Sequence, residues 1–208
     1  MTNTIEISVS QARGLILASA KSDVRYYLNG TLFDFENGRA VSTDGHCLLA
    51  INVQASCDDV AYTQGIANRE DLETIAKLGK VDDVISVSFD ERGLTFERAG
   101  RGTLTALAID GRFPDYQRVI PEKWTNEQAL FDPDLVARAS KALKLALDTK
   151  TGKPELAQNG KAAALITVCG MGDKAIAVVM PWRPSKKFAP LRELADFQKP
   201  ALAKSQAA

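Results

Sequence analysis

Hydrophobic positions along the chain alternate between two-residue spacing and the three-to-four-residue spacing of helices, and the two patterns recur in a fixed order. Residues 5–9 alternate as a strand, and Ser10 is placed to cap a following helix. Residues 26–36 alternate again. Asn37-Gly38 predicts a type I′ hairpin that leads into returning strands over residues 39–53. The first unit is therefore predicted to be strand, helix and strand meander.

A second unit repeats this order. Residues 65–67 predict a short strand, and Asn68 is placed to cap a helix that ends near Gly79. Residues 84–109 then alternate, with turn residues at two places, which predicts a three-stranded meander.

The third unit begins after a proline-containing linker. Residues 128–131 are predicted as a strand, Asp132-Pro133 as the start of a helix to about residue 147, and residues 163–180 as a hairpin. The intervening polar stretch, residues 148–161, is predicted as a loop. Each unit is too small to bury its own core, so we expect the units to pair into layers of sheet and helix.

Composition argues against most enzyme classes. His46 is the only histidine, which excludes multi-histidine metal sites and leaves a single imidazole for a catalytic triad. No phosphate-binding or dinucleotide-binding glycine motif is present, and no pair of carboxylates is marked as catalytic, although such pairs remain open. We expect no enzymatic activity, no cofactor and no metal.

Cysteine usage and the lack of a signal peptide predict a cytoplasmic protein, and the charge balance bears on its partners. The chain has 26 basic residues (lysine plus arginine) and 26 acidic residues (aspartate plus glutamate), so it lacks the basic excess that is typical of nucleic-acid-binding proteins. The three cysteines lack metal-binding spacing and are expected to be reduced thiols. The polar N-terminus lacks a signal peptide, and no apolar run is long enough to span a membrane.

Three segments carry a family resemblance. They are residues 23–30 leading into Thr43-Asp-Gly-His46, residues 110–116 with Arg118-Val119, and Val178-Val-Met-Pro181 with Arg183. In this order they resemble the beta subunit of bacterial DNA polymerase III, the replicative sliding clamp. The resemblance runs from about Thr4 to Arg183, so the chain is similar to a shortened member of that family.

The resemblance implies an α+β DNA-clamp fold, with repeated strand–helix–meander modules, helices lining a ring and sheets outside. Residues 1–117 would form a complete clamp domain of two modules, like the family's middle domain. Residues 118–183 would form a reduced domain of about one module, like its last domain. Residues 184–208 are expected to be a flexible tail, in which Leu194–Phe197 loosely resembles the peptides that clamp grooves bind.

The implied function is that of a processivity factor. Such a protein encircles duplex DNA without regard to sequence and tethers DNA polymerase, clamp loader and other replication or repair partners. A homo-oligomeric ring is expected, with a tetramer favoured and a trimer or dimer as alternatives. The competing hypothesis is a clamp-like interaction protein that binds or competes with a full-length clamp without encircling DNA.

The resemblance also implies a cleft for partner peptides. The corresponding positions combine apolar walls with prolines at the rim: Leu28, Thr43, Gly45, His46, Cys47, Leu48, Pro114, Arg118, Val119, Val178, Met180, Pro181, Trp182 and Arg183. The alternative is that the apolar members are ordinary core between units. Cys47 stands where the family commonly carries arginine, and Trp182 where it carries a smaller apolar residue, so the peptides bound are expected to differ.

Duplex DNA would contact lysine and arginine side chains on the predicted helices and directly beyond them, because sliding requires many phosphate contacts and no base readout. The residues expected to face DNA are Arg13, Lys21, Arg25, Arg69, Lys77, Lys80, Arg138, Lys141 and Lys144. The alternative for each set is an ordinary solvated helix face.

Overall fold

The computed structural model describes residues 3–183 except residues 78, 99, 101 and 122–124. Among these residues, no helix is long and apolar enough to cross a membrane. The α-helices are α1 (Val9–Ala18), α2 (Arg69–Lys77) and α3 (Pro133–Ala146), and the short 3-10 helices are η1 (Tyr26–Leu28) and η2 (Tyr116–Val119). The strands are β1 (Asn3–Ser8), β2 (Gly30–Asp34), β3 (Arg39–Thr43), β4 (Cys47–Asn52), β5 (Gln54–Ser56), β6 (Gln64–Asn68), β7 (Val84–Asp90), β8 (Gly93–Arg98), β9 (Gly102–Ala106), β10 (Pro154–Ala157), β11 (Ala164–Val168) and β12 (Ala175–Val179).

The strands form two antiparallel sheets in which the first two units exchange their leading strands. One sheet has the order β5-β1-β7-β8-β9, and the other has the order β10-β11-β12-β4-β3-β2-β6. Strand β1 of the first unit pairs with β7 of the second, and β6 of the second unit pairs with β2 of the first. Because each sheet contains strands from both units, neither unit can fold as a separate body.

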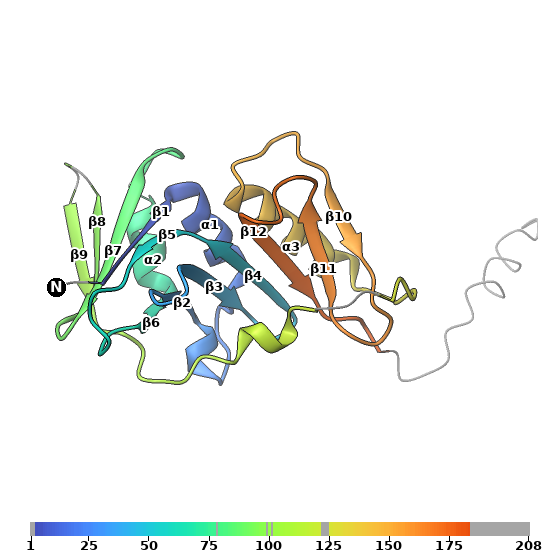
Figure 1. Cartoon of the computed structure of the whole chain (residues 1–208), viewed down its shortest axis with the longest axis horizontal. Helices are drawn as coiled ribbons and strands as arrows, with labels where there is room; N and C mark the ends of the chain where they lie inside the picture. Colours follow the sequence, from blue (N-terminus) through green and yellow to red (C-terminus); the bar gives the residue numbers. More distant parts are fainter. Residues whose placement is uncertain (1–2, 78, 99, 101, 122–124, 184–208) are drawn as a thin grey trace, which may run out of the picture.

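The third unit joins the first through strand pairing. Strand β12 pairs with β4 from Ala175↔Ile51 to Val179↔Cys47, so one sheet continues across both units. In Figure 1 this sheet runs from β6 through β4 to β12, β11 and β10. Strands β7, β8 and β9 of the other sheet lie at the end of the molecule that is farthest from β10. The continuous sheet fixes the position of the third unit relative to the first.

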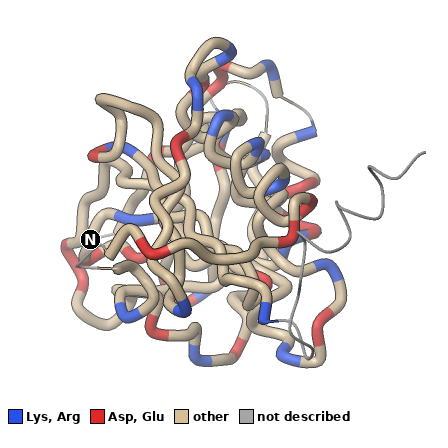
Figure 2. The backbone as a smooth tube through the Cα atoms, turned by 90° about the vertical axis from the view of Figure 1, so that its right-hand side faces the viewer, with Lys and Arg blue, Asp and Glu red and all other residues tan. Residues whose placement is uncertain are grey.

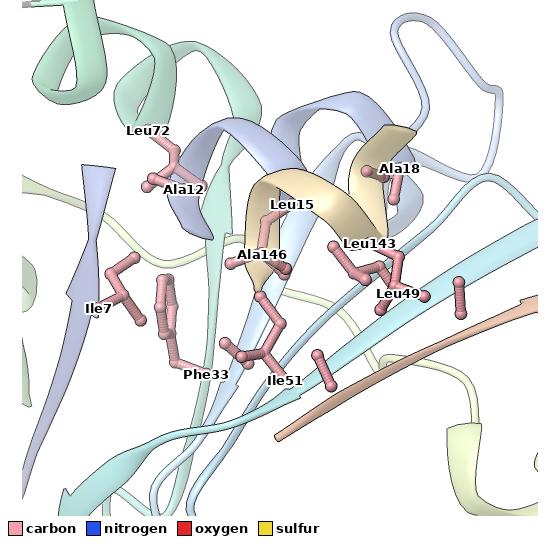
Figure 3. Close-up of a cluster of buried hydrophobic side chains, with 14 of the residues drawn as sticks. Ile7, Ala12, Leu15, Ala18, Phe33, Leu49, Ile51, Leu72, Leu143 and Ala146 are labelled. Carbon is pink, nitrogen blue, oxygen red and sulfur yellow. The ribbon is translucent and has the colours of Figure 1, made fainter. Parts of the chain in front are cut away.

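The main core lies between the helices and the sheets. Helix α1 contacts both α2 and α3, and side chains such as Leu15, Phe33 and Leu143 meet beneath it (Figure 3). Gly14 allows α1 to approach α3 closely, since a Cβ at this position would lie 2.7 Å from the carbonyl oxygen of Ala142. We infer that a side chain at Gly14 would push the two helices apart.

A second core covers the opposite face of the larger sheet. It contains Leu48 and Val178 from β4 and β12, together with Phe113 and Tyr116 from the segment that follows β9. This segment therefore packs on the face of the sheet that the helices leave free. The edge between this second core and the third unit is where the candidate site is found.

The predicted α+β fold class is confirmed, but two local predictions at the start of the chain are wrong. Helix α1 is capped by Ser8 rather than Ser10, because Ser8 and Gln11 form a reciprocal capping box. The turn at Asn37-Gly38 is not type I′, since Gly38 has a positive φ of 59° and Asn37 does not. The alternating residues 26–36 are a 3-10 turn followed by the shorter strand β2.

In the third unit, residues 128–131 are not a strand, although the backbone of Leu130 accepts a hydrogen bond from Trp182. Strand β10 lies instead within the polar stretch 148–161 that was predicted as a loop. The predicted domain boundary at residue 117 falls inside η2, and it stays a prediction. The expected tail, residues 184–208, lies outside the described residues.

Candidate functional site

An apolar cleft of about 160 Å³ opens where the first unit, η2 and β12 meet. Its floor includes Leu48, Val178 and Leu28, which are all buried. Val119 and Met180 form part of its wall. This volume suits one or two apolar side chains rather than a whole small molecule, because sites for small molecules usually have several hundred Å³.

The turn between β3 and β4 forms one rim of the cleft and is held by hydrogen bonds within the turn. The Thr43 hydroxyl donates to the carbonyl oxygen of Cys47 at 2.6 Å and accepts from the backbone N–H of Gly45 at 3.0 Å. Gly45 has a φ of 88°, a conformation that glycine adopts at low cost. The backbone N–H of Met180 donates to the carbonyl oxygen of His46 at 2.9 Å, which ties the rim to the chain beyond β12.

Asp44 and Arg138 connect this turn to α3. The Asp44 carboxylate accepts hydrogen bonds from the backbone N–H groups of His46 and Cys47 and pairs with the Arg138 guanidinium. Burial alone would raise the pKa of Asp44, but these two N–H donors and the Arg138 cation lower the pKa below its ordinary value. The ion pair therefore holds the third unit against the cleft at neutral pH.

Arg25 covers the outer side of the same turn. Its guanidinium donates to both carboxylate oxygens of Asp23, at 3.0 and 2.8 Å, and this hydrogen bonding lowers the pKa of Asp23 to about 2. A Cβ on Gly45 would lie 2.9 Å from a terminal nitrogen of Arg25, so a larger residue at Gly45 would displace that guanidinium. Arg25 thus adds a positive charge to the cleft rim.

Cys47 is part of the apolar lining and not a nucleophile. It is 2% exposed, and burial raises the pKa of its thiol to about 12. The thiol therefore remains protonated at neutral pH. The cation nearest to this thiol is Arg138 of α3, which pairs with Asp44.

The structure brings most of the residues predicted for the peptide cleft together. The members that line it are Leu28, Thr43, Gly45, His46, Cys47, Leu48, Pro114, Val119, Val178 and Met180. Pro181, Trp182 and Arg183 lie in an adjoining hollow of about 650 Å³ that shares His46 and Met180 with the cleft. Arg118 lies in a further small hollow beside Val119 and Met180. Their role in binding peptides stays a prediction.

Sequence reasoning missed three residues that line the cleft. Asp115 directly precedes η2, Tyr116 is the first residue of η2, and Arg25 was expected to face DNA. Tyr116 is buried, and its hydroxyl donates to Asp34 at 3.0 Å. All three lie within or directly beside segments that carried the family resemblance, and this was the signal that could have identified them.

A basic groove of about 540 Å³ lies between α1, α3 and the segment after α3, on the helical side of the molecule. Arg13, Lys141 and Lys144, all expected to face DNA, line this groove, and Lys150 joins them. Lys141 and Lys150 are exposed, whereas Arg13 and Lys144 are half-buried. Asp148 is the acidic residue in the lining. The groove therefore presents a net positive charge.

The other residues expected to face DNA lie in different environments. Lys21, Lys77 and Lys80 are exposed. Arg69 is turned inward: it pairs with Glu73 at 2.8 Å, donates to the backbone of α1 and leaves 12% of its side chain exposed. Arg138 is bound to Asp44. These two arginines hold the protein together and are poorly placed to meet phosphates.

Charge is mixed over the surface as a whole. Figure 2 shows lysine and arginine positions interspersed with aspartate and glutamate positions over the whole backbone. No cluster of three or more His, Cys, Asp and Glu side chains suited to a metal ion occurs in the part of the chain that the structure describes. The basic groove is thus a local feature on a neutral chain.

A larger hollow, of about 1000 Å³, runs along residues 108–117 and shares Pro114, Asp115 and Tyr116 with the cleft. The buried carboxylate of Asp34 lies in its wall. That carboxylate accepts hydrogen bonds from Asn37, Gln64 and Tyr116, so its bonding capacity is used within the protein. We therefore do not assign a ligand to this hollow.

Residues 6–115, more than half of the chain, match the family model described as the DNA polymerase III beta subunit, central domain. The chain is 33% identical over 166 residues to the beta sliding clamp of Vibrio cholerae, covering 75% of this chain and 45% of that protein. It is 35% identical over 126 residues to the beta sliding clamp of Pseudomonas putida, covering 57% and 34%. The chain thus spans less than half the length of these curated relatives.

Solved structures show the same fold. The DNA polymerase sliding clamp of Pseudomonas aeruginosa matches with a TM-score of 0.64 and 22% identity, over 87% of this chain and 67% of that one. The Helicobacter pylori beta clamp, solved with a bound DNA ligase peptide, matches with a TM-score of 0.66 and 17% identity over 88% of this chain and 66% of that one.

Proposed function

Because the chain belongs to the DNA polymerase III beta subunit family, matched through its central domain, we propose that it acts as a shortened sliding clamp. Copies of the chain would assemble into a ring around duplex DNA and tether DNA polymerase, clamp loader and other replication or repair partners. A tetramer is the favoured assembly. The ring would stay on DNA because it encloses the duplex, and this role requires no catalytic group.

The basic groove on the helical side is the observation that carries this proposal. Lys141 and the half-buried Lys144 lie three residues apart on α3, and Arg13 of α1 lines the same groove. Phosphate contacts of this kind bind DNA without reading its sequence. In a ring, each copy would present the same groove to one duplex, so a modest local charge would be multiplied.

The cleft supports the tethering part of the proposal. Its apolar lining and small volume fit the Leu or Phe side chain of an extended peptide. The Helicobacter pylori relative was solved with a peptide from a partner enzyme, and we propose that this chain also takes partner peptides, at its own cleft. The adjoining hollow with Trp182 would take the residues that follow the anchor.

We propose that the two-unit region, residues 1–117, is the clamp domain proper. Its support is the exchange of β1 and β6, which makes two units one body. Residues 118–183 would be a reduced second domain, joined to the first through β12 and β4. Among the described residues, the end strands β9 and β10 each pair on one side only, and self-association would cover their outer edges.

Topological retention tests the proposal. The protein is dissociated by dilution and concentrated again in the presence of a closed circular plasmid or of the same plasmid cut once. Gel filtration then separates free protein from protein on DNA. A ring stays on the circle and slides off the linear form. Equal loss from both forms contradicts the proposal, and a single chain that binds a full-length clamp supports the competing interaction protein.

A further inference from the structure

Helix α3 ends inside the basic groove in a hydrogen-bonded turn that contains Asp148. The backbone N–H of Thr149 donates to the carbonyl oxygen of Lys144 at 3.1 Å, and the N–H of Asp148 donates to that of Leu145 at 3.1 Å. These two hydrogen bonds form a Schellman motif, in which Asp148 occupies the position after the helix cap. The buried hydroxyl of Ser10 on α1 also donates to the Leu145 carbonyl at 2.7 Å, so the turn is fixed against α1.

Aspartate is unfavourable at this position for two reasons. Asp148 has a φ of 46°, in the left-handed region where a helix end usually carries glycine and sometimes asparagine. Of the other described residues with a positive φ, all are glycine except Asn126. The Asp148 side chain also lies at the C-terminal end of a helix, where the partial negative charge of the peptide dipoles disfavours an anion. The local structure of the turn therefore does not explain the aspartate.

The Asp148 carboxylate is exposed in the groove and is bound to no other group. Among the residues that the structure describes, no hydrogen bond or ion pair involves this carboxylate. The cations that line the same groove are Arg13, Lys141, Lys144 and Lys150. Asp148 thus adds a negative charge to a basic surface without holding any of these cations in place.

We infer that Asp148 limits the affinity of the basic groove for DNA. A phosphate that approaches Lys141 and Lys144 also approaches the Asp148 carboxylate, which repels it. Each contact is then weak enough to break and form again as the duplex moves past. This inference rests on the proposed sliding clamp and concerns how strongly each copy holds the DNA that the ring encloses.

The charge balance of the groove supports a limiting role. Cations that neutralise phosphates release counterions, and the affinity for DNA rises steeply with the number of such contacts. A ring of several copies would present the same groove several times, so its contacts would add up. One carboxylate in each groove lowers this sum in every copy. A ring that encloses the duplex does not need tight contacts in order to stay on it.

Binding to a short linear duplex tests the inference, because a ring can slide off the ends and the affinity then reports the strength of the contacts. Asp148→Asn removes the charge and keeps a side chain that tolerates a positive φ. This variant should bind the duplex at least about three-fold more tightly at low salt, the effect of removing one unit charge several Å from a phosphate in water. The difference should shrink as salt screens the repulsion. Fluorescence anisotropy at several salt concentrations measures both effects.

Two further variants separate the charge of Asp148 from backbone strain and from net charge. Asp148→Gly removes the charge and also relieves the strain of the positive φ, so it should bind the short duplex as tightly as Asp148→Asn. Asp173→Asn makes the same chemical change at an exposed position that does not line the groove, and it should bind like the wild type. Rings loaded on a circular plasmid that is then cut should leave it more slowly when they carry Asp148→Asn.

The inference is wrong if Asp148→Asn binds the short duplex no more tightly than the wild type, or if Asp173→Asn tightens binding equally. It is also wrong if only Asp148→Gly tightens binding, because backbone strain and not charge would then be the cause. Retention of the wild type on circular DNA together with any of these results leaves the proposed clamp intact. Equal loss of the wild type from circular and linear DNA contradicts the clamp, and the inference with it.

Discussion

The basic groove lies on the helical side of the larger sheet, whereas the apolar cleft lies beside the second core on the other face, and the two regions differ in how they can bind. The groove is lined by charged side chains, among them Arg13, Lys141 and Lys144, around a volume of about 540 Å³. The cleft has a small volume, about 160 Å³, and a floor of buried apolar residues held by a hydrogen-bonded turn. Charged contacts act additively and weaken with salt, whereas an apolar pocket depends on the shape of a few side chains.

Helix α3 contributes to both regions. Lys141 and Lys144 reach the groove, and one turn earlier Arg138 pairs with Asp44 behind the cleft. Cations of one helix thus have different roles. Lys141 and Lys144 line the groove, whereas Arg138 is bound to another part of the protein. If the two regions are independent, substitutions at one should leave the other unchanged.

The largest effect is expected from reversing charge in the groove. Lys141→Glu with Lys144→Glu should lower retention on circular DNA by about 100-fold or more at moderate salt, because each chain of the ring would lose two phosphate contacts and gain two repulsive ones. Gel filtration on plasmid DNA at several salt concentrations measures this loss. Peptide binding at the cleft should not change.

The matched control reverses two exposed lysines outside the groove. Lys161→Glu with Lys174→Glu carries the same net charge change, but neither residue lines the groove. If this variant loses DNA as strongly as the groove variant, net charge and not the groove is responsible. Unchanged retention in the groove variant would remove Lys141 and Lys144 from the DNA contact.

The sequence predicted the order of elements better than their partners. Residues 84–89 and Asp132-Pro133 have local signals, a strand alternation and a helix cap, and both were placed correctly. The exchange of β1 and β6 has no such signal, since alternation indicates a strand but not the strand beside it. Strand β10 was missed because Pro-Glu-Leu-Ala lacks β-branched residues.

For the candidate site, the resemblance located the cleft but could not decide which charges are free. Arg69 and Lys77 both lie on α2, yet Arg69 folds back onto α1 and Lys77 has 77% of its side chain exposed. This difference depends on where α1 ends, because the carbonyl oxygens of Ile16 and Ser19 accept from Arg69. Whether each of these cations is free therefore depends on a contact between distant segments. The spacing of residues along one helix carries no information about such a contact.

The next largest effect concerns the ion pair behind the cleft. Arg138→Ala should lower the free energy of unfolding by about 1–3 kcal/mol, because Asp44 would keep its half-buried charge without the cation. Urea unfolding measures the change. Arg92→Ala is the control, since its pair with Asp90 is exposed and should contribute little. Similar losses in both variants would mean that the Arg138 pair is an ordinary surface contact.

A smaller effect is expected from shortening one wall of the cleft. Met180→Ala should weaken binding of a synthetic partner peptide with Leu and Phe anchors by about 10-fold, the loss of one apolar contact. Met180 is 40% exposed, so the fold should tolerate the change. Fluorescence anisotropy measures binding. Trp182→Ala, in the adjoining hollow, should weaken binding less, and the reverse order would place the anchor in that hollow.

The smallest expected effect is a pH dependence of the free energy of unfolding that comes from Asp44, the partner of Arg138 on α3. The folded protein lowers the pKa of Asp44 below its ordinary value of 3.8. The unfolded chain therefore binds the proton more readily, so the stabilisation is fully present above about pH 4 and is lost as the pH falls through the lower, folded pKa. Urea unfolding of wild type and Asp44→Asn between pH 3 and pH 6 isolates this contribution, because Asp23 and Asp90 titrate alike in both proteins. The wild type should lose more stability with falling pH than the variant. Parallel curves would show that the Asp44 charge does not hold the third unit in place.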